Sequence, residues 1–476
     1  MCRLQRSLSL SKGACGSLNL KLETNFMSTT YLLLTVVFAV VFLLFLVLKL
    51  KLNAFIALLI TSMFVGVATG MPLSGIIESI QKGMGGTLGF VATVVGLGAI
   101  FGQMLESSGG AESMARYLVK KFGEKRAPFA MVLTGFFVGI PVFLDVGFII
   151  LVPIVYALSR DTKKSVLYYG IPLLAGLAVT HSFIPPTPGP VAVAEIINAE
   201  LGYVILWGFI LGLPIAILAG PVFGRYISKK IIVFPPENID VIHPETRKDL
   251  PSFGLIISII AIPLFLILLA TVTDVMVKKQ FVPAGLIPEI LGFIGHPFTA
   301  LTIATLISIY FLGIKKGFNK KEILDLSTKA LGPAGIIILI TGAGGVLKQI
   351  LVDSGIGKMM AESIADSSLP PVLLAWILAA IVRVTQGSAT VAMITAAGIM
   401  APVLEVFSLT PTHTALVVLA IASGATLLSH VNDSGFWLVG KYFGMTEKQT
   451  LQSWTVMESI ISVLGLILTL TVSSLL

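Results

Sequence analysis

Charged residues are scarce in this chain of 476 residues, and their scarcity excludes whole classes of protein. Only 12% of the residues are Asp, Glu, Lys or Arg, whereas soluble domains carry about 25%. This composition excludes a soluble enzyme, a disordered protein and a nucleic-acid-binding module. Cysteine is equally scarce, since Cys2 and Cys15 both precede residue 27. The rest of the chain therefore has neither a disulfide framework nor a thiolate metal site, and cysteine usage leaves the redox compartment undetermined.

Apolar sequence is what the chain has in abundance. Hydrophobic residues make up 56% of it, and its mean hydropathy is +0.98. A membrane-spanning helix needs about 20 largely apolar residues. Runs of that kind occur at 29–48, 53–70, 86–106, 204–224, 254–273, 299–313, 334–351 and 451–472. Two more, 165–183 and 412–428, lead into the breaks HSFIPPTPGP (181–190) and SHVNDSGF (429–436). We expect an all-α polytopic membrane protein in a lipid bilayer.

Two apolar stretches are too long for one crossing. The stretch 127–158 is interrupted by GIPVFLD (139–145), and the stretch 370–405 by RVTQGSAT (383–390). A re-entrant hairpin, which enters and leaves on one side of the membrane, fits each better than two full crossings. Its irregular tip would have to be buried in protein or line a water-filled cavity.

The distribution of basic residues predicts the orientation. With the N-terminus outside, 22 Lys and Arg residues fall in cytoplasmic segments and four in external segments. Such a bias is typical of cytoplasmic loops. The net charge of +8 therefore reflects orientation and not a nucleic-acid or other acidic partner. Both ends of the mature chain are predicted to lie outside.

The two halves of the chain resemble each other. A shift of 246 residues aligns 83–115 with 329–361 at ten identical positions of 33, and it places Gly189 on Gly435. Each half would then hold five crossings, one hairpin and one broken helix. An odd number of crossings inverts the second repeat relative to the first, and paired helix breaks indicate the substrate site of a secondary transporter.

The predicted organisation has four parts. They are an N-terminal extension (1–26), a first transmembrane repeat (27–225), a cytoplasmic linker (226–251) and a second transmembrane repeat (252–476). We expect the extension to be a disordered tail, or sequence that precedes a natural start at Met27.

Polar residues gather at the two hairpin tips and the two helix breaks. Backbone N–H groups at the start of a half-helix bind anions, and ionisable residues inside a membrane span are functional candidates. The candidates for substrate binding are Thr187, Arg383, Thr385, Gln386, Ser388, Asn432 and Ser434. The candidates for proton coupling are Asp145, His181, His430 and Asp433.

Other interpretations of these residues stay open from sequence alone. Asp145 could cap the second arm of its hairpin. Arg383 could bind a substrate carboxylate through two parallel hydrogen bonds, or it could be the internal counter-ion of Asp145 or Asp433. His181 could tie down a neighbouring backbone carbonyl. Lys348, near a span end, is expected to reach the membrane interface and not to bind a ligand.

Five segments together resemble the gluconate permease family. They are GMGGTLGFVATVVGLGAIFGQMLESSGGAESMAR (83–116), GIPVFLDVGFIILVPI (139–154), HSFIPPTPGPVAVA (181–194), TQGSATVAMITAAG (385–398) and SHVNDSGFW (429–437). The resemblance extends from about Met27 to the C-terminus. It implies a bacterial inner-membrane symporter that imports gluconate or a related sugar acid with protons. It also implies membership of an ion-transporter superfamily built from inverted repeats with re-entrant hairpins.

The resemblance leaves the substrate and the coupling ion to be weighed. Similar family members carry D-serine, glycerate, or hexonates such as idonate and fructuronate. Sodium-coupled dicarboxylate relatives have Ser-Asn-Thr at their hairpin tips, whereas the tips here contain FLD and TQGS. Proton coupling is therefore preferred over sodium, with no cofactor. Assembly of several copies of the chain stays open.

Two other classes of function are less compatible with the sequence. An intramembrane aspartyl protease would need Gly-x-Gly-Asp, but the contexts of the two aspartates are FLDVG and VNDSG. The His-Glu-x-x-His motif of a metalloprotease is absent. A passive channel is compatible with paired breaks and an inverted repeat, but these features favour a carrier.

Overall fold

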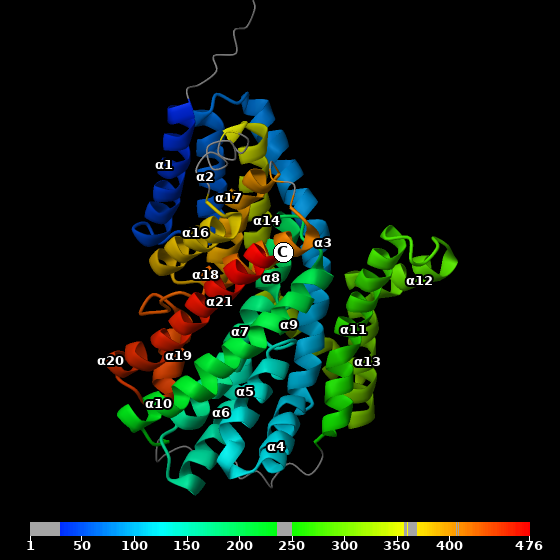
Figure 1. Cartoon of the computed structure of the whole chain (residues 1–476), viewed down its shortest axis with the longest axis vertical. Helices are drawn as coiled ribbons and strands as arrows, with labels where there is room; N and C mark the ends of the chain where they lie inside the picture. Colours follow the sequence, from blue (N-terminus) through cyan, green and yellow to red (C-terminus); the bar gives the residue numbers. More distant parts are fainter. Residues whose placement is uncertain (1–28, 236–249, 357–358, 360–368, 406, 408) are drawn as a thin grey trace, which may run out of the picture.

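The computed structural model describes residues 29–235, 250–356, 359, 369–405, 407 and 409–476, and within these residues it is helical without a strand. Figure 1 shows an elongated bundle in which long helices run at various tilts. Seven helical stretches in this part of the chain are long and apolar enough to cross a membrane. The prediction of an all-α polytopic membrane protein is confirmed.

The first half contains ten α-helices. They are α1 (Thr29–Leu48), α2 (Ala54–Ala68), α3 (Leu73–Ser107), α4 (Gly110–Phe122), α5 (Ala127–Val138), α6 (Leu144–Thr162), α7 (Leu167–Phe183), α8 (Pro188–Ile196), α9 (Leu201–Ile217) and α10 (Phe223–Lys230). A π-helical turn, Leu218–Val222, joins α9 to α10. The predicted interruption between α5 and α6 and the predicted break between α7 and α8 are both present.

The second half follows a similar order. Its helices are α11 (Phe253–Lys278), α12 (Leu286–Gly295), α13 (Pro297–Ser308), α14 (Lys320–Asp353), α16 (Pro371–Gln386), α17 (Ala389–Leu404), α18 (Pro411–Gly424), α19 (Ser434–Phe443), α20 (Glu447–Thr450) and α21 (Val456–Leu475). Here α16 and α17 form the second predicted hairpin, and a break separates α18 from α19. Two short helices, α4 and α12, were not expected from the sequence.

The long helices α3 and α14, which the 246-residue shift makes equivalent, pack against each other in opposite directions. The Ser79 hydroxyl donates a 2.6 Å hydrogen bond to Asp353 near the start of α3 and the end of α14. Further along α3, Gly83 lies against the backbone of Gly345. Two inverted repeats require that equivalent helices run in opposite directions, as α3 and α14 do. The count of five crossings and one hairpin per repeat stays a prediction.

Glycines let the hairpin arms approach the broken helices closely. A Cβ on Gly135 of α5 would lie 2.2 Å from the carbonyl oxygen of Leu173 in α7. In the second half, a Cβ on Gly424 of α18 would lie 2.4 Å from the carbonyl oxygen of Trp376 in α16. Small residues at helix interfaces are typical of membrane proteins. This packing holds each hairpin tip beside the break of its own half.

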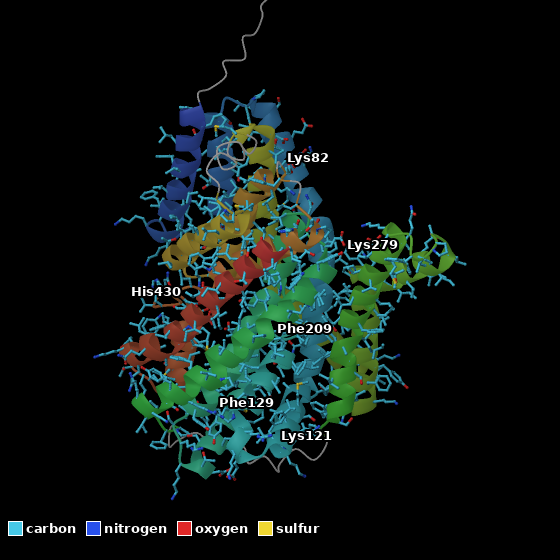
Figure 2. The ribbon with its side chains drawn as sticks, in the orientation of Figure 1. Lys82, Lys121, Phe129, Phe209, Lys279 and His430 are labelled. Atoms are coloured by element: carbon cyan, nitrogen blue, oxygen red, sulfur yellow. The ribbon has the colours of Figure 1, made fainter. Side chains whose placement is uncertain are left out.

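The helices α11, α12 and α13 form an arm at one side of the bundle. The arm contacts α3 through α13 and contacts α9 through α11, and α12 extends away from the body (Figure 1). Lys82, predicted to be external, lies toward the upper end of the molecule, and Lys121, predicted to be cytoplasmic, lies at the lower end (Figure 2). Lys279, also predicted to be external, lies at the upper part of the arm. The sidedness itself stays a prediction.

The predicted extension 1–26 lies outside the described residues, as does most of the predicted linker 226–251. The helices on either side of this linker are α10, which ends at Lys230, and α11, which begins at Phe253. The boundaries of the two transmembrane repeats also stay predictions.

Candidate functional site

A polar cavity of about 360 Å³ lies where the second hairpin tip, the second helix break and the start of α6 meet. It is lined by the first turns of α6, α17 and α19 and by the end of α7. Trp454, in the π-helical turn Leu451–Thr455, and Glu458 of α21 complete the lining. Its volume falls in the range of about 300–1,000 Å³ that is usual for small-molecule sites. A single cavity therefore collects residues from both halves of the chain.

Arg383 pairs with Asp433 beside this cavity. Its side chain is 3% exposed, and its Nη2 atom donates a 2.6 Å hydrogen bond to Oδ2 of Asp433. Its Nε and Nη1 atoms are buried without a hydrogen-bond partner in the described structure. Of the two roles left open by the sequence, the counter-ion contact with Asp433 is therefore present. Two guanidinium nitrogens, Nε with one N–H and Nη1 with two, have no partner among the described residues.

The carboxylate of Asp433 accepts two further hydrogen bonds. Oδ1 accepts from the backbone N–H of Gly435 at 3.2 Å, so that Asp433 is the N-cap of α19. Oδ2 also accepts from the hydroxyl of Ser429, which in turn accepts a 2.6 Å hydrogen bond from the indole N–H of Trp454. Both carboxylate oxygens of Asp433 therefore have hydrogen-bond donors.

Asp145 and His181 face the cavity from the first half. Asp145 lies in the first turn of α6, and its side chain is exposed to the cavity. The N-cap residue is Phe143, and no side-chain hydrogen bond caps this helix, so Asp145 makes no capping contact. The Nδ1 atom of His181 is buried without a hydrogen-bond partner in the described structure. The imidazole ring packs edge to face against the ring of Phe143, with 6.3 Å between the ring centroids.

His430 and Asn432 hold the second break against the end of α16. The ring Nε2 of His430 lies 2.9 Å from the carbonyl oxygen of Val384, and the Asn432 amide donates to the same oxygen at 3.0 Å. Gly387 follows α16 with φ +90°, and a Cβ there would lie 2.2 Å from the Asn432 carbonyl oxygen. This contact fixes the hairpin tip to the break. His430 does not line the cavity, whereas Asn432 does.

The remaining candidates divide into two groups. Gln386, Ser388 and Ser434 line the cavity, and Oε1 of Gln386 is buried without a described partner. Thr187 and Thr385 do not line it. Their hydroxyls instead donate to carbonyls of their own segments, Thr187 to Ile184 at 2.6 Å and Thr385 to Ile381 at 2.8 Å.

Glu458 is a cavity residue that the sequence analysis missed. It lies at the start of α21, it is 4% exposed, and it lines the cavity. Glu458 could have been found from the sequence, because it is an acidic residue inside the predicted span 451–472. An acidic residue within a membrane span is by itself a functional candidate.

The arrangement suits a small anion that carries hydroxyl groups. The N-termini of α6, α17 and α19 bring partial positive charge to the cavity, and Arg383 adds a guanidinium group with unpaired donors. A carboxylate group matches both features. The neighbouring amide and hydroxyl groups can hydrogen-bond to polar groups on the rest of the ligand.

Comparison with known proteins agrees with this chemistry. The family model described as "GntP family permease" matches residues 31–476. A gluconate permease of Pseudomonas aeruginosa and a low-affinity gluconate transporter of Escherichia coli K12 are each 42% identical to the chain. Each match covers 93% of this chain and 98% of the relative. The L-idonate transporter of the Gnt-II system in Escherichia coli K12 is 39% identical over 93% of this chain and 99% of that relative.

Two solved structures share the fold at low sequence identity. The YdaH transporter of Alcanivorax borkumensis matches with a TM-score of 0.59 and 14% identity, over 92% of this chain and 97% of that chain. MtrF of Neisseria gonorrhoeae gives the same TM-score and identity over 94% of this chain and 95% of that chain. The family match over residues 31–476, together with relatives of 42% identity, shows that this multi-pass membrane protein belongs to the GntP family of permeases.

Proposed function

We propose that the protein imports gluconate together with protons across the inner membrane of a bacterium, with both ends of the chain outside. The observation that carries this proposal is the pair of unpaired guanidinium donors, Nε and Nη1 of Arg383, buried beside a cavity that three helix N-termini enter. The relatives named as gluconate permeases and transporters support the choice of substrate.

The substrate carboxylate would bind at Arg383. Because Nη2 is engaged by Asp433, the carboxylate would accept a hydrogen bond from Nε or from Nη1, which point to different edges of the planar guanidinium group. The substrate hydroxyls would contact Gln386, Ser388, Asn432 and Ser434, which line the same cavity. In this arrangement Asp433 orients the guanidinium and does not contact the substrate.

Transport would proceed by alternating access around this fixed cavity. The antiparallel pair α3 and α14 and the paired helix breaks support two inverted repeats, in which one bundle moves against the other. Coupling to protons would require a carboxyl or imidazole group that takes up a proton when substrate binds. Asp145, His181 and Glu458 line the cavity and are the candidates for this role, whereas His430 does not line it.

L-Idonate is the second candidate substrate because a relative of 39% identity is named as its transporter. The choice between gluconate and L-idonate can be tested by measuring uptake of labelled gluconate into liposomes that contain the purified protein. Unlabelled gluconate should compete best, followed by L-idonate, with glycerate and D-serine weaker. Replacing a proton gradient by a sodium gradient should abolish accumulation. Better competition by D-serine, or accumulation driven by sodium, would refute the proposal.

A further inference from the structure

Three carboxyl groups share one guanidinium group at the cavity. Its charged and titratable lining residues are Asp145 on α6, His181 on α7, Arg383 on α16, Asp433 at the start of α19 and Glu458 on α21. Arg383 is the only Lys or Arg among the lining residues. A bound gluconate would add a fourth carboxylate. A site shielded from water does not hold such an excess of negative charge, because burying an uncompensated charge is costly.

The three carboxyl groups differ in what stabilises their charge. Asp433 accepts hydrogen bonds from Arg383, Ser429 and Gly435, so both of its carboxylate oxygens already have donors. Asp145 is exposed to the cavity and lies in the first turn of α6, where the helix dipole favours negative charge.

Glu458 has neither form of support. Its side chain is buried, and no described residue donates a hydrogen bond to it, while Arg383 and Asp433 are the charged groups that act on it. The helix that carries it, α21 (red in Figure 1), packs against α18 and against α16, the helix that carries Arg383. The carboxylate form of Glu458 is therefore stabilised only by its attraction to Arg383, and Asp433 already neutralises part of that positive charge.

Resting on the proposed symport, we propose that Glu458 carries the transported proton, and that the single positive charge of Arg383 couples its protonation to substrate binding. When the site is empty, Arg383 balances Asp433 and partly stabilises an ionised Glu458. When a substrate carboxylate binds to an unpaired donor of Arg383, the site gains one negative charge. Glu458 then takes up one proton from solution as an O–H bond on its carboxylate, and the net charge of the site is unchanged.

The direct test is proton uptake on binding, measured with the purified wild-type protein and a pH indicator in weakly buffered solution. At alkaline pH, where Glu458 is ionised in the empty protein, addition of gluconate to the wild-type protein should remove about one proton from solution per gluconate bound. The Glu458→Gln variant mimics the protonated form, so it should bind gluconate without proton uptake. Its affinity should be independent of pH, whereas the wild-type affinity should fall as the pH is raised.

Transport by the same variant gives a second measurement. In liposomes, Glu458→Gln should exchange external labelled gluconate for internal gluconate but should not accumulate it under a pH gradient. The matched control is Glu106→Gln, which changes a half-buried glutamate on α3 that does not line the cavity. This control should retain both proton uptake and accumulation.

Failure of this inference and failure of the proposed function give different results. If the wild-type protein binds no gluconate, the proposed function is wrong. If the wild-type protein couples gluconate to protons and Glu458→Gln still takes up one proton, the inference is wrong. Loss of gluconate binding in a folded Glu458→Gln protein would also overturn it. Should that variant fail to fold, Glu458→Asp provides the test, because it keeps a carboxyl group. This variant should still take up one proton per gluconate bound. Gluconate binding by Glu458→Asp without proton uptake would contradict the inference.

Discussion

The guanidinium Nη2 of Arg383 and the carboxylate Oδ2 of Asp433 lie 2.6 Å apart, although the two residues are separated by 50 positions in the chain. One belongs to the last turn of a hairpin arm, and the other is the N-cap of the half-helix α19. The ion pair therefore joins the hairpin tip to the helix break. It also orients the guanidinium so that its other donors remain unpaired at the cavity.

Arg383→Lys tests whether these donors bind substrate. An ammonium group can retain the contact with Asp433, but it lacks the planar set of donors that would remain for a carboxylate. Loss of one charge-assisted hydrogen bond costs about 1.5–3 kcal/mol, so gluconate affinity should fall about 10–100-fold. Titration of the purified protein by calorimetry measures this change. An unchanged affinity would leave Arg383 with the counter-ion role alone.

Asp433→Asn tests the ion pair itself. Asparagine can still cap α19, but it leaves the buried guanidinium without its carboxylate, a change that costs about 3–5 kcal/mol. We expect a lower melting temperature and loss of concentrative uptake. Replacing both residues, as Arg383→Gln with Asp433→Asn, should recover part of the lost stability but not the uptake. Normal uptake by Asp433→Asn would remove the ion pair from the mechanism.

His430→Gln separates the two roles considered for this histidine. The ring contacts the carbonyl of Val384 and does not line the cavity, and a glutamine amide can donate to the same carbonyl. Proton-driven uptake should therefore persist, with stability changed by no more than about 1 kcal/mol. Uptake measured across a range of imposed pH gradients checks this expectation. A variant that binds gluconate but no longer responds to the gradient would restore His430 as a coupling residue.

Gly387→Ala tests the junction between tip and break. The residue has φ +90°, and a Cβ would lie 2.2 Å from a backbone oxygen of Asn432. Strain and the required displacement of Asn432 should lower stability by about 1–3 kcal/mol and reduce uptake. Gly335→Ala is the control, since a Cβ on this residue of α14 meets nothing within 4 Å. That change should be neutral or stabilising by up to about 1 kcal/mol. Similar melting temperatures for the two variants would contradict this account of the junction.

The interrupted helices could be predicted from sequence because their causes are local. Pro and Gly residues at 181–190 and polar residues at 429–436 disfavour a continuous apolar helix, and the structure breaks both helices there. The short helices α4 and α12 were missed since neither is a long apolar run. α4 has a charged face, and α12 has only ten residues.

The partners inside the site could not be predicted from sequence. Arg383 had two candidate counter-ions, and only the packing of α16 against the second break selects Asp433 over Asp145. Thr187 and Thr385 lie at the expected breaks, yet their hydroxyls bond to nearby carbonyls. The sequence gives no indication of which way such a side chain turns. Glu458 was hidden because one acidic residue barely changes the hydropathy of a long span.

The central claim is that a proton gradient drives gluconate through the cavity beside Arg383. The most direct measurement is accumulation of labelled gluconate in liposomes with an acidic exterior, with and without a protonophore. We expect internal gluconate to rise above the external concentration, and we expect the protonophore to abolish this accumulation while leaving exchange intact. Accumulation that persists when the gradient is collapsed would contradict the account.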